Sequence, residues 1–486
     1  MKLSGFWGRA RELKQLQVLW QVNAAHLVAI TGRRRVGKSR LIQEFGKQVP
    51  LCLELSGLPP EAHTTAQNQR DEFSRQLAKQ IKLPRFQSSD WGELLQALAD
   101  QTRKHPTLIL LDEVSWMGSK DPLFLGKLKT VWDTAFKKHP KVMLVLCGSV
   151  SSWIEQNILS STGYFGRLSL KIHLQELPLE DCQGFWGKQG QQISAYEKFK
   201  ILSVTGGIPR YLEEIDPRQS AEENIRQLCF LDSGILFDEF KYMFSDLFQR
   251  RAAVYQAIVQ KLVQGPATAD EIFKSLAKTK SGAISSYLDD LCQSSFISRD
   301  YTWHILRGET SKLSRYRLSD NYLRFYLKYI ATNLHKIKQG HFKNQPLSTL
   351  PGWDSIMGLQ FENLVLGNRS LLLQQLNIPT SELIFDNPYF QNATRIAQGC
   401  QIDYLIQTKF NTLYGCEIKF SKQPIAIGII NEMQKKISRL KLPKRYSVRP
   451  VLVHVNGVDE AVVDADYFSQ IVDFGEFLSS FPKLKL

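Results

Sequence analysis

The sequence predicts an α/β fold built on a parallel sheet that is covered by helices. Short apolar runs typical of buried strands recur between longer helical segments, at residues 26–30, 51–55, 107–111, 141–146 and 168–172. This alternation indicates parallel pairing, because the helix between two strands returns the chain to the same end of the sheet. At 486 residues the chain is long enough for about three domains.

The chain is strongly basic, with a formal net charge of +15 and a pI near 9.3. This excess favours a polyanionic partner, and we expect nucleic acid, DNA rather than RNA. A charge that only serves solubility is the alternative. The hydrophobic content of 43% is enough to form folded cores.

Cysteine usage and the lack of long apolar runs indicate the compartment. The seven cysteines lie far apart and form no CxxC pair, which predicts reduced thiols and no zinc site. The N-terminus lacks the apolar core of a secretory signal, and no stretch approaches the ~18 apolar residues that span a bilayer. We therefore expect a cytoplasmic protein with no membrane partner.

A glycine-rich loop follows the first predicted strand. Residues 32–39 read GRRRVGKS, which fits the phosphate-loop pattern GxxxxGK[ST], and a helical run follows at 40–45. Such a loop wraps a triphosphate with its backbone N–H groups, while Lys38 reaches the β and γ phosphates and Ser39 binds Mg²⁺. The residues expected at the nucleotide are Gly32, Arg33, Arg34, Arg35, Val36, Gly37, Lys38, Ser39 and Arg40.

Three further positions lie beside predicted strands of the same sheet. Asp112 and Glu113 end the run at 107–111, where Asp112 is expected to bind Mg²⁺ and Glu113 to orient the attacking water. Ser149, after the run at 141–146, would contact the γ-phosphate or the water, unless it only forms a turn. Arg167 would reach a γ-phosphate as a finger in the same or a neighbouring subunit, with an ordinary surface arginine as the alternative.

Taken together, these motifs resemble the archaeal-type ATPases of the AAA+/STAND branch of P-loop NTPases. The resemblance covers roughly residues 1–240 and also uses the segments at 6–9, 164–167 and 205–212. It implies that Phe6, Gly8 and Arg9 lie near the adenine and that a helical lid closes over the nucleotide through a turn ending at Pro209. It also implies an ATPase core at 1–180, a lid at 181–248 and self-association through the ATPase domain.

The segment 249–320 is expected to be a winged helix-turn-helix. Three short helical runs, at 252–259, 270–276 and 282–291, precede strand-like runs at 296–301 and 314–318, which is the order of that motif. If this domain reads DNA, the contacting residues would be Lys278, Lys280, Ser281, Arg307, Lys312 and Arg315. A packing module without DNA contacts is the alternative.

The C-terminal segment 321–486 holds a second group of charged residues on predicted strands. Asp403 lies in the run 401–406, and Glu417 and Lys419 lie two residues apart in the run 413–420. Residues two apart on a strand face the same way, so these three side chains can converge. Asp403 and Glu417 would bind Mg²⁺, and Lys419 would position water or stabilise charge on a phosphodiester.

This arrangement resembles the PD-(D/E)XK nuclease superfamily, which has an α/β restriction-endonuclease-like fold. Glu362 on an upstream helix matches the first acidic position and is an expected metal ligand, with Gln434 in support. The basic residues near 435–449 could hold an anionic strand beside the site. The alternatives are an ordinary salt bridge between Glu417 and Lys419, or a domain that binds DNA without cutting it.

The sequence thus predicts a protein that binds and hydrolyses ATP with Mg²⁺, and whose nucleotide state controls a DNA-binding, Mg²⁺-dependent nuclease-like C-terminal domain. The alternative is a nucleotide-switched regulatory or DNA-binding protein with a catalytically silent C-terminal domain.

Overall fold

The structure is a computed structural model that describes residues 5–61, 63–82, 84, 86–148, 151–248, 252–276, 282–393 and 398–478. The chain divides into two compact units, Gly5–Leu177 and the part that begins at Pro178. The first boundary predicted from sequence, at residue 180, lies close to this division. The boundaries predicted at 248 and 320 fall inside the second unit and stay predictions.

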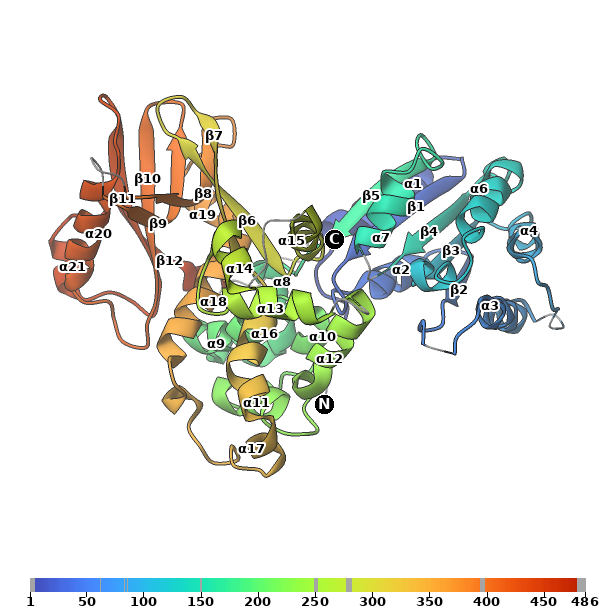
Figure 1. Cartoon of the computed structure of the whole chain (residues 1–486), viewed down its shortest axis with the longest axis horizontal. Helices are drawn as coiled ribbons and strands as arrows, with labels where there is room; N and C mark the ends of the chain where they lie inside the picture. The colour runs from blue at the N-terminus through green and yellow to red at the C-terminus, as the bar shows by residue number, and fades with distance from the viewer. Residues whose placement is uncertain are drawn as a thin grey trace. The chain divides into compact units, whose positions relative to one another are not determined.

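The first unit is built on a five-stranded sheet with the order β2-β3-β4-β1-β5 (Figure 1). Its strands are β1 (His26–Gly32), β2 (Leu51–Ser56), β3 (Thr107–Asp112), β4 (Val142–Cys147) and β5 (Leu168–Leu174). Every neighbouring pair is parallel, so the α/β prediction is confirmed for this part of the chain. Its α-helices are α1 (Ala10–Gln21), α2 (Lys38–Gly46), α3 (Ala66–Ile81), α4 (Trp91–Gln101), α5 (Val114–Met117), α6 (Phe124–Thr134) and α7 (Ser151–Ile154).

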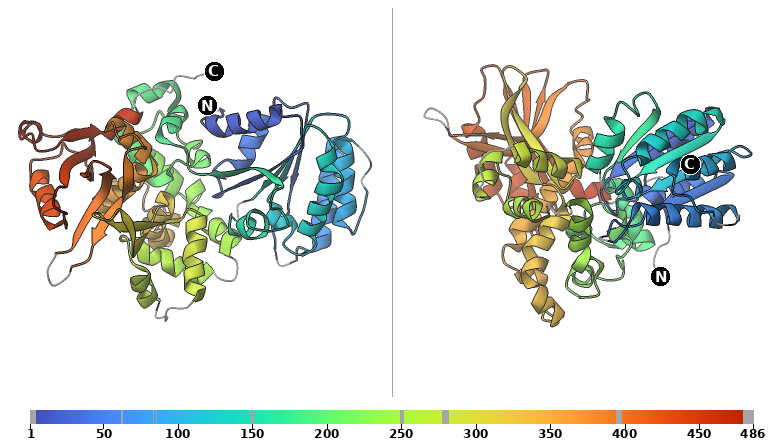
Figure 2. Two further views of the ribbon diagram at one scale, coloured as in Figure 1. Left: turned by 90° about the horizontal axis from the view of Figure 1, so that it is seen from above. Right: turned by 45° about the vertical axis from the view of Figure 1, so that its right-hand side comes forward.

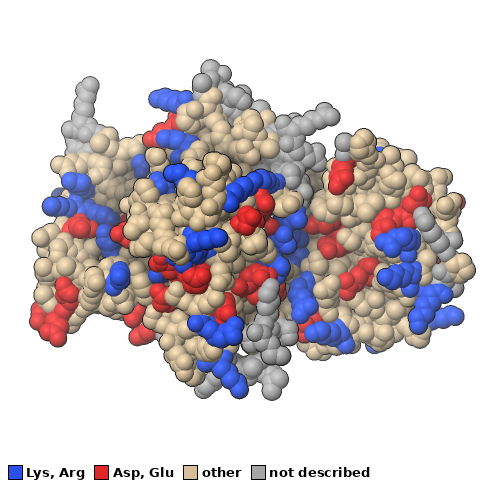
Figure 3. All heavy atoms as spheres, turned by 90° about the horizontal axis from the view of Figure 1, so that it is seen from below, with Lys and Arg blue, Asp and Glu red and all other residues tan. Residues whose placement is uncertain are grey.

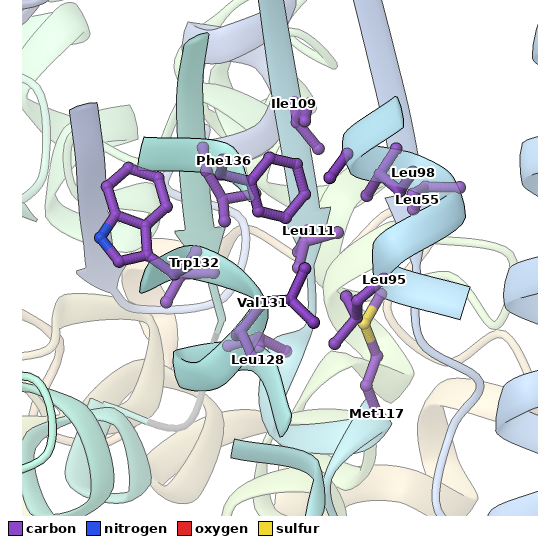
Figure 4. Close-up of a cluster of buried hydrophobic side chains, with 14 of the residues drawn as sticks. Leu55, Leu95, Leu98, Ile109, Leu111, Met117, Leu128, Val131, Trp132 and Phe136 are labelled. Atoms are coloured by element: carbon purple, nitrogen blue, oxygen red, sulfur yellow. The ribbon is translucent and has the colours of Figure 1, made fainter. Parts of the chain in front are cut away.

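One face of this sheet packs against helices α4 and α6. Leu95 of α4 and Leu128 and Val131 of α6 join Ile109 and Leu111 of β3 in one buried hydrophobic cluster (Figure 4). Successive strand residues point to opposite faces, and a strand that is apolar at every position must be covered on both. Helices accordingly lie on both sides of the sheet (Figure 2).

The strand order decides which loops meet. In a parallel sheet the carboxyl ends of all strands lie at one edge, and loops from neighbouring strands share that edge. Strands β3, β4 and β1 are adjacent, so the segments after Asp112, Cys147 and Gly32 come together. The sheet therefore assembles three segments that the sequence analysis assigned to one site.

The second unit begins with a helical region. Its elements are α8 (Leu179–Cys182), the 3₁₀ segment η3 (Gln183–Gln192), α9 (Ala195–Thr205), α10 (Pro209–Leu212), α11 (Ala221–Cys229) and α12 (Ile235–Phe248). Three helices and an antiparallel hairpin follow: α13 (Ala252–Leu262), α14 (Ala269–Ser275), α15 (Gly282–Gln293), β6 (Ile297–His304) and β7 (Glu309–Leu318). This is the element order predicted for 249–320, while the assignment as a winged helix stays a prediction.

A mixed sheet with the order β12-β11-β10-β9-β8 forms the C-terminal part. Its strands are β8 (Leu383–Gln391), β9 (Cys400–Thr408), β10 (Thr412–Phe420), β11 (Ser447–Val455) and β12 (Gln470–Asp473), with β8, β9 and β10 antiparallel and β10, β11 and β12 parallel. The helices here are α16 (Asn321–Phe325), α17 (Leu334–Lys338), α18 (Trp353–Gly367), α19 (Arg369–Gln375), α20 (Gly428–Arg439) and α21 (Glu460–Asp464). Helix α20 connects β10 to β11, and α18 packs on β10.

The hairpin β6–β7 is packed into the C-terminal sheet. Buried Trp303 stacks on Phe385 of β8 with ring centroids 5.2 Å apart, and its indole N–H donates to Gln407 of β9. The Gln407 amide donates in turn to the carbonyl of Ile305 at 2.8 Å. The hairpin thus shares a core with the sheet, which favours the packing alternative for its inner face.

The residues expected to contact DNA through this hairpin differ in exposure. Arg307 and Lys312 are exposed. Arg315 is half-buried, with its guanidinium 4.6 Å from the ring centre of Phe390 and hydrogen-bonded to Gln401. Lys278, Lys280 and Ser281 lie outside the described residues.

Candidate functional site

The phosphate loop connects β1 to α2 through backbone conformations that favour glycine. Gly32 has φ +141°, and a Cβ there would lie 2.4 Å from the carbonyl oxygen of Leu174. Gly37, with φ 94°, immediately precedes α2. The first N–H groups of α2 have no partner within the helix, so they can bind an anion held in the loop. Local sequence therefore builds a phosphate cradle at the carboxyl edge of the sheet.

Lys38 lies over this loop. Its ammonium donates to the carbonyl oxygens of Gly32 at 2.9 Å and Arg33 at 3.1 Å, and its side chain is buried. The positive charge is therefore held at the loop, where an anionic ligand would be bound.

Ser39 and Asp112 are brought together from two adjoining elements. The Ser39 hydroxyl donates to Oδ2 of Asp112 at 2.7 Å, and Oδ1 of Asp112 accepts from the backbone N–H of Glu113 at 3.1 Å. A hydroxyl and a carboxylate at one point are oxygen donors of the kind that Mg²⁺ prefers. These residues therefore fit the predicted metal.

Glu113 is held in a left-handed conformation, with φ 49° and ψ 48°, just before α5. A non-glycine residue in this region is uncommon and marks a constrained backbone. Its carboxylate lies near the end of β4, since a Cβ at Gly148 would be 3.8 Å from Oε2 of Glu113. Ser149, the expected sensor, lies outside the described residues.

Arg9 connects the loop to the segment that follows β5. Its guanidinium donates to the carbonyl oxygens of Val36 at 3.0 Å and Gln175 at 2.6 Å, and it is buried. Arg33 forms an ion pair with Glu176 at 3.5 Å on the same segment. Both arginines thus bind the phosphate loop to the chain beyond β5, a structural role that the sequence analysis did not predict.

The remaining residues expected at the nucleotide vary in exposure. Phe6, Gly8, Arg34 and Arg35 are partly buried and Arg40 is exposed. Pro209 is the first residue of α10. Their nucleotide contacts stay predictions.

One unpredicted neighbour of the loop is His173 of β5. It forms a hydrogen bond with the Thr31 hydroxyl at 2.9 Å. Burial and the nearby Lys38 ammonium lower the pKa of His173.

Arg167 lies at the amino end of β5, on the side of the sheet opposite the phosphate loop. It immediately precedes β5, whose first residue Leu168 pairs with Leu27 near the start of β1, whereas Leu174 pairs with Gly32. Six strand residues at ~3.3 Å each place Arg167 about 20 Å from the loop. Its guanidinium instead binds both carboxylate oxygens of Asp133, at 2.9 and 2.8 Å. A finger role therefore requires a neighbouring subunit.

A second cluster lies on the C-terminal sheet, where Asp403 of β9 and Glu417 of β10 converge. Lys436 of α20 joins them, with its ammonium 3.1 Å from Oδ1 of Asp403 and 2.5 Å from Oε2 of Glu417. Oδ2 of Asp403 accepts from the backbone N–H of Ile418 at 3.0 Å. The convergence expected from strand alternation is therefore present, but it includes a lysine that the sequence analysis placed only in a basic segment.

Lys419 lies on the same face of β10 as Glu417, and their charged groups are 3.1 Å apart. Its ammonium also binds Glu432 of α20 at 2.9 Å. Burial, followed by the nearby Asp403, raises the pKa of Glu417, although Lys436 and Lys419 oppose the shift. For Lys436, burial disfavours the charge, but Asp403 and Glu417 outweigh it and raise its pKa.

Glu362 of α18 belongs to the electrostatic surroundings of Asp403. Burial raises the pKa of Glu362 to about 7, and the Asp403 carboxylate adds to the shift while Arg317 and Arg324 oppose it. Across the described ranges, no group of three or more His, Cys, Asp or Glu side chains forms a metal-ligand cluster. The carboxylate pair can attract a cation, but Lys436 already lies between its members.

The spacing of residues in α20 gives only a partial signal for Lys436. Glu432 and Lys436 are four residues apart, and such positions lie on one face of a helix. The sequence does not reveal which face of α20 packs on the sheet, so it could not separate Lys436 from the exposed Lys435.

The first unit and its site define a nucleotide-binding α/β domain of the phosphate-loop type. Residues 6–215 match the sequence model of a family described as an ATPase domain predominantly from Archaea. The chain therefore carries an archaeal-type ATPase domain. The match ends before the segments predicted as a winged helix and a nuclease-like domain.

Two known proteins extend the comparison. The uncharacterized protein MJECL04 of Methanocaldococcus jannaschii is 25% identical over 365 residues, which cover 74% of this chain and 76% of that protein. The solved structure of the Walker-type ATPase PABY2304 of Pyrococcus abyssi aligns with a TM-score of 0.51 at 16% identity, covering 66% of this chain and 96% of the other. The second likeness shows a shared fold. No helix within the described part of this chain is long and apolar enough to cross a membrane.

Proposed function

We propose that this protein binds ATP with Mg²⁺ and hydrolyses it, and that its nucleotide state controls a DNA-binding, nuclease-like C-terminal region. The observation that carries the ATPase proposal is the contact between Ser39 and Asp112 at 2.7 Å, beside a phosphate loop that holds Lys38. Fixed cationic and metal-binding groups around phosphate oxygens are what phosphoryl transfer requires of a protein.

Each residue of the loop has a distinct role in this proposal. The Lys38 ammonium exchanges its loop carbonyls for β- and γ-phosphate oxygens, and the N–H groups at the start of α2 bind the same phosphates. Ser39 and Asp112 hold Mg²⁺, which neutralises developing charge on the phosphates when bound. Glu113 orients the attacking water and accepts its proton.

Two substitutions test the ATPase proposal. Lys38→Ala should abolish ATP binding, measured with a fluorescent ATP analogue, because it removes the phosphate-binding charge. Glu113→Gln keeps the shape of the side chain and should bind ATP while losing hydrolysis. Wild-type hydrolysis rates in both variants would exclude this site.

The proposal that nucleotide state controls the C-terminal cluster is supported by the packing of helix α9 on strand β10 inside the second unit. Tyr196 of α9 stacks on Phe420 of β10, with ring centroids 4.8 Å apart and planes within 15° of parallel. Phe420 directly follows Lys419, and it also contacts Phe361 of α18 at 5.3 Å between centroids. Helix α9 belongs to the predicted lid, so a lid movement would reach the strand that carries Glu417 and Lys419.

DNA binding is supported by charge. Beyond the net charge of +15, the chain around α20 is rich in basic residues, namely Lys435, Lys436, Arg439, Lys441, Lys444, Arg445 and Arg449. On the face drawn in Figure 3, Lys and Arg side chains lie interspersed with Asp and Glu side chains. A strand held near α20 would lie close to Asp403 and Glu417.

Nuclease activity is a second proposed function, favoured by the convergence of Asp403, Glu417 and Lys419. Asp403 and Glu417 would hold Mg²⁺ or Mn²⁺, and Lys419 would stabilise charge on the phosphate. The test is a cleavage assay on single- and double-stranded DNA, with each metal, with and without ATP. Cleavage that disappears in Glu417→Ala, while ATP binding persists, supports the nuclease. No cleavage of any substrate leaves the alternative of a nucleotide-switched DNA-binding protein with a silent C-terminal region.

A further inference from the structure

The carboxylate pair of the C-terminal cluster has all four of its oxygens bound by protein donors. Asp403 accepts from Lys436 at 3.1 Å and from the Ile418 N–H at 3.0 Å. Glu417 accepts from Lys436 at 2.5 Å and from Lys419 at 3.1 Å. Three of these four bonds come from two ammonium groups, of which Lys436 contacts both carboxylates and Lys419 is shared with Glu432.

Lys436 lies where a bridging metal ion would have to bind. Its ammonium contacts one oxygen of each carboxylate, and a compact cation between two carboxylates is the arrangement that a divalent metal would also adopt. The side chain of Glu417 is only 1% exposed, whereas that of Lys436 is 28% exposed. Lys436 is thus the member of the trio that can move into solvent, because its ammonium ends a flexible four-carbon chain.

We propose that Lys436 is a built-in counter-ion that competes with a divalent cation for Asp403 and Glu417, and so limits metal binding at the C-terminal cluster. This inference rests on the proposed metal-dependent function of that cluster. A metal ion binds between the two carboxylates only after Lys436 has left both of them. Glu417 keeps its bond to Lys419 in either arrangement, which holds that carboxylate in place.

The competition also has a stability consequence. Removing one partner from a buried charge pair leaves an uncompensated charge, which is strongly destabilising. A protein without the Lys436 ammonium should therefore be less stable when metal is absent. A metal ion that binds only the folded state would restore that stability.

The test compares Lys436→Met with its parent by titrating Mn²⁺ into the full-length protein without nucleotide, followed by calorimetry. Both proteins carry Asp112→Asn, which removes the carboxylate ligand of the phosphate-loop site. Lys436→Met keeps an unbranched side chain of nearly the same length and removes its charge. We expect it to bind Mn²⁺ roughly tenfold more tightly or better, because a charge-assisted competitor has been removed. Adding Glu417→Gln should abolish the gain.

Lys409→Met provides the matched control. Lys409 is an exposed lysine in the turn between β9 and β10, so its loss changes the net charge equally. It should leave Mn²⁺ affinity at the parent value. A gain as large as that of Lys436→Met would attribute the effect to net charge and overturn the proposal.

Thermal unfolding gives a second readout, which can be measured even when the variant is less stable without metal. In EDTA, Lys436→Met should unfold at a lower temperature than its parent, and Mn²⁺ should raise its midpoint by more than it raises the parent's. Equal Mn²⁺ affinities and equal midpoint shifts in the two proteins would overturn the inference. If Glu417→Gln nevertheless weakens Mn²⁺ binding in the parent, the proposed metal site itself stands. If neither protein binds Mn²⁺ through Glu417, both the inference and the metal-dependent function fail.

Discussion

The hydroxyl of Ser39 donates a hydrogen bond to Oδ2 of Asp112 at 2.7 Å, which joins the first turn of α2 to the end of β3. These residues are far apart in sequence and meet because β1 and β3 lie on either side of β4. The contact brings the two Mg²⁺ ligands of the proposed ATPase site to one point.

Replacing Ser39 tests that contact. Ser39→Ala removes the hydroxyl ligand and should reduce Mg²⁺-dependent ATP hydrolysis by roughly 10²-fold. Ser39→Thr keeps a hydroxyl and should retain most activity, because the phosphate-loop pattern accepts either residue. The measurement is phosphate release at saturating ATP. Equal loss in both variants would contradict a role for the hydroxyl.

Replacing Gly32 tests whether the conformation of the phosphate loop requires a glycine at this position. Gly32→Ala places a Cβ 2.4 Å from the Leu174 carbonyl oxygen, so the loop must shift and both stability and ATP affinity should fall. Gly126→Ala is the control, since a Cβ at this exposed position of α6 meets nothing within 4 Å. It should raise the free energy of unfolding by about 0.5–1 kcal/mol. Chemical denaturation and ATP titration measure both effects, and wild-type ATP affinity in Gly32→Ala would refute this reading.

Replacing Arg167 tests whether one subunit supplies an arginine finger to the ATPase site of its neighbour. Because it lies about 20 Å from the loop of its own sheet, a finger role predicts that Arg167→Ala loses hydrolysis but not ATP binding. Mixing it with Lys38→Ala should restore part of the activity, since the second variant supplies an intact arginine to a neighbour's intact loop. Arg103→Ala, which removes an exposed arginine of the same unit, should have no effect. If the mixture is no more active than its separate components, a finger acting between subunits is excluded.

Replacing Trp303 tests whether the packing of the β6–β7 hairpin on the C-terminal sheet stabilises the fold. Trp303→Ala removes a side chain that is 2% exposed and should cost about 3–5 kcal/mol of the free energy of unfolding, because it leaves a cavity and removes the indole donor from the side-chain oxygen of Gln407. Tyr301→Ala on the same strand, where the side chain is 37% exposed, should cost much less. Urea denaturation of the full chain measures both. Similar losses would mean that the hairpin is not part of the core.

Glu362 predicts a pH dependence of stability. Its folded-state pKa is raised from 4.5 to about 7, so its neutral form is favoured in the folded protein. This contribution is fully present below pH 4.5 and is lost as the pH rises to about 7. Relative to Glu362→Gln, the wild type should lose on the order of 3 kcal/mol over this window, since one pKa unit corresponds to about 1.4 kcal/mol. Denaturation curves across the window measure the difference, and a constant difference would contradict the raised pKa.

Much of the ATPase site could be predicted because its information is local. The pattern from Gly32 to Ser39 specifies a turn and a helix start. The apolar run before Asp112 specifies a buried strand that ends in a carboxylate. These features depend on neighbouring residues and on the alternation of strands and helices, which a sequence displays directly.

Contacts across elements could not be predicted in the same way. The sequence left open whether Arg167 would reach a loop in its own or in a neighbouring subunit, and the register of β5 with β1 places it at the end of the sheet opposite its own loop. Lys436 and Lys435 were equivalent members of a basic segment until the packing of α20 directed one of them to Asp403 and Glu417.

For this protein the sequence by itself determined the phosphate loop, the strand-ending carboxylates and the alternation of Glu417 with Lys419. Only the tertiary structure decided that Trp303 packs the hairpin into the C-terminal sheet and that Lys436 lies between two carboxylates. The physical reason is the separation along the sequence of the residues that fix each feature. Backbone turns and strand alternation are fixed by residues a few positions apart, whereas the partner of a buried side chain depends on strand register and on which helix face meets the sheet.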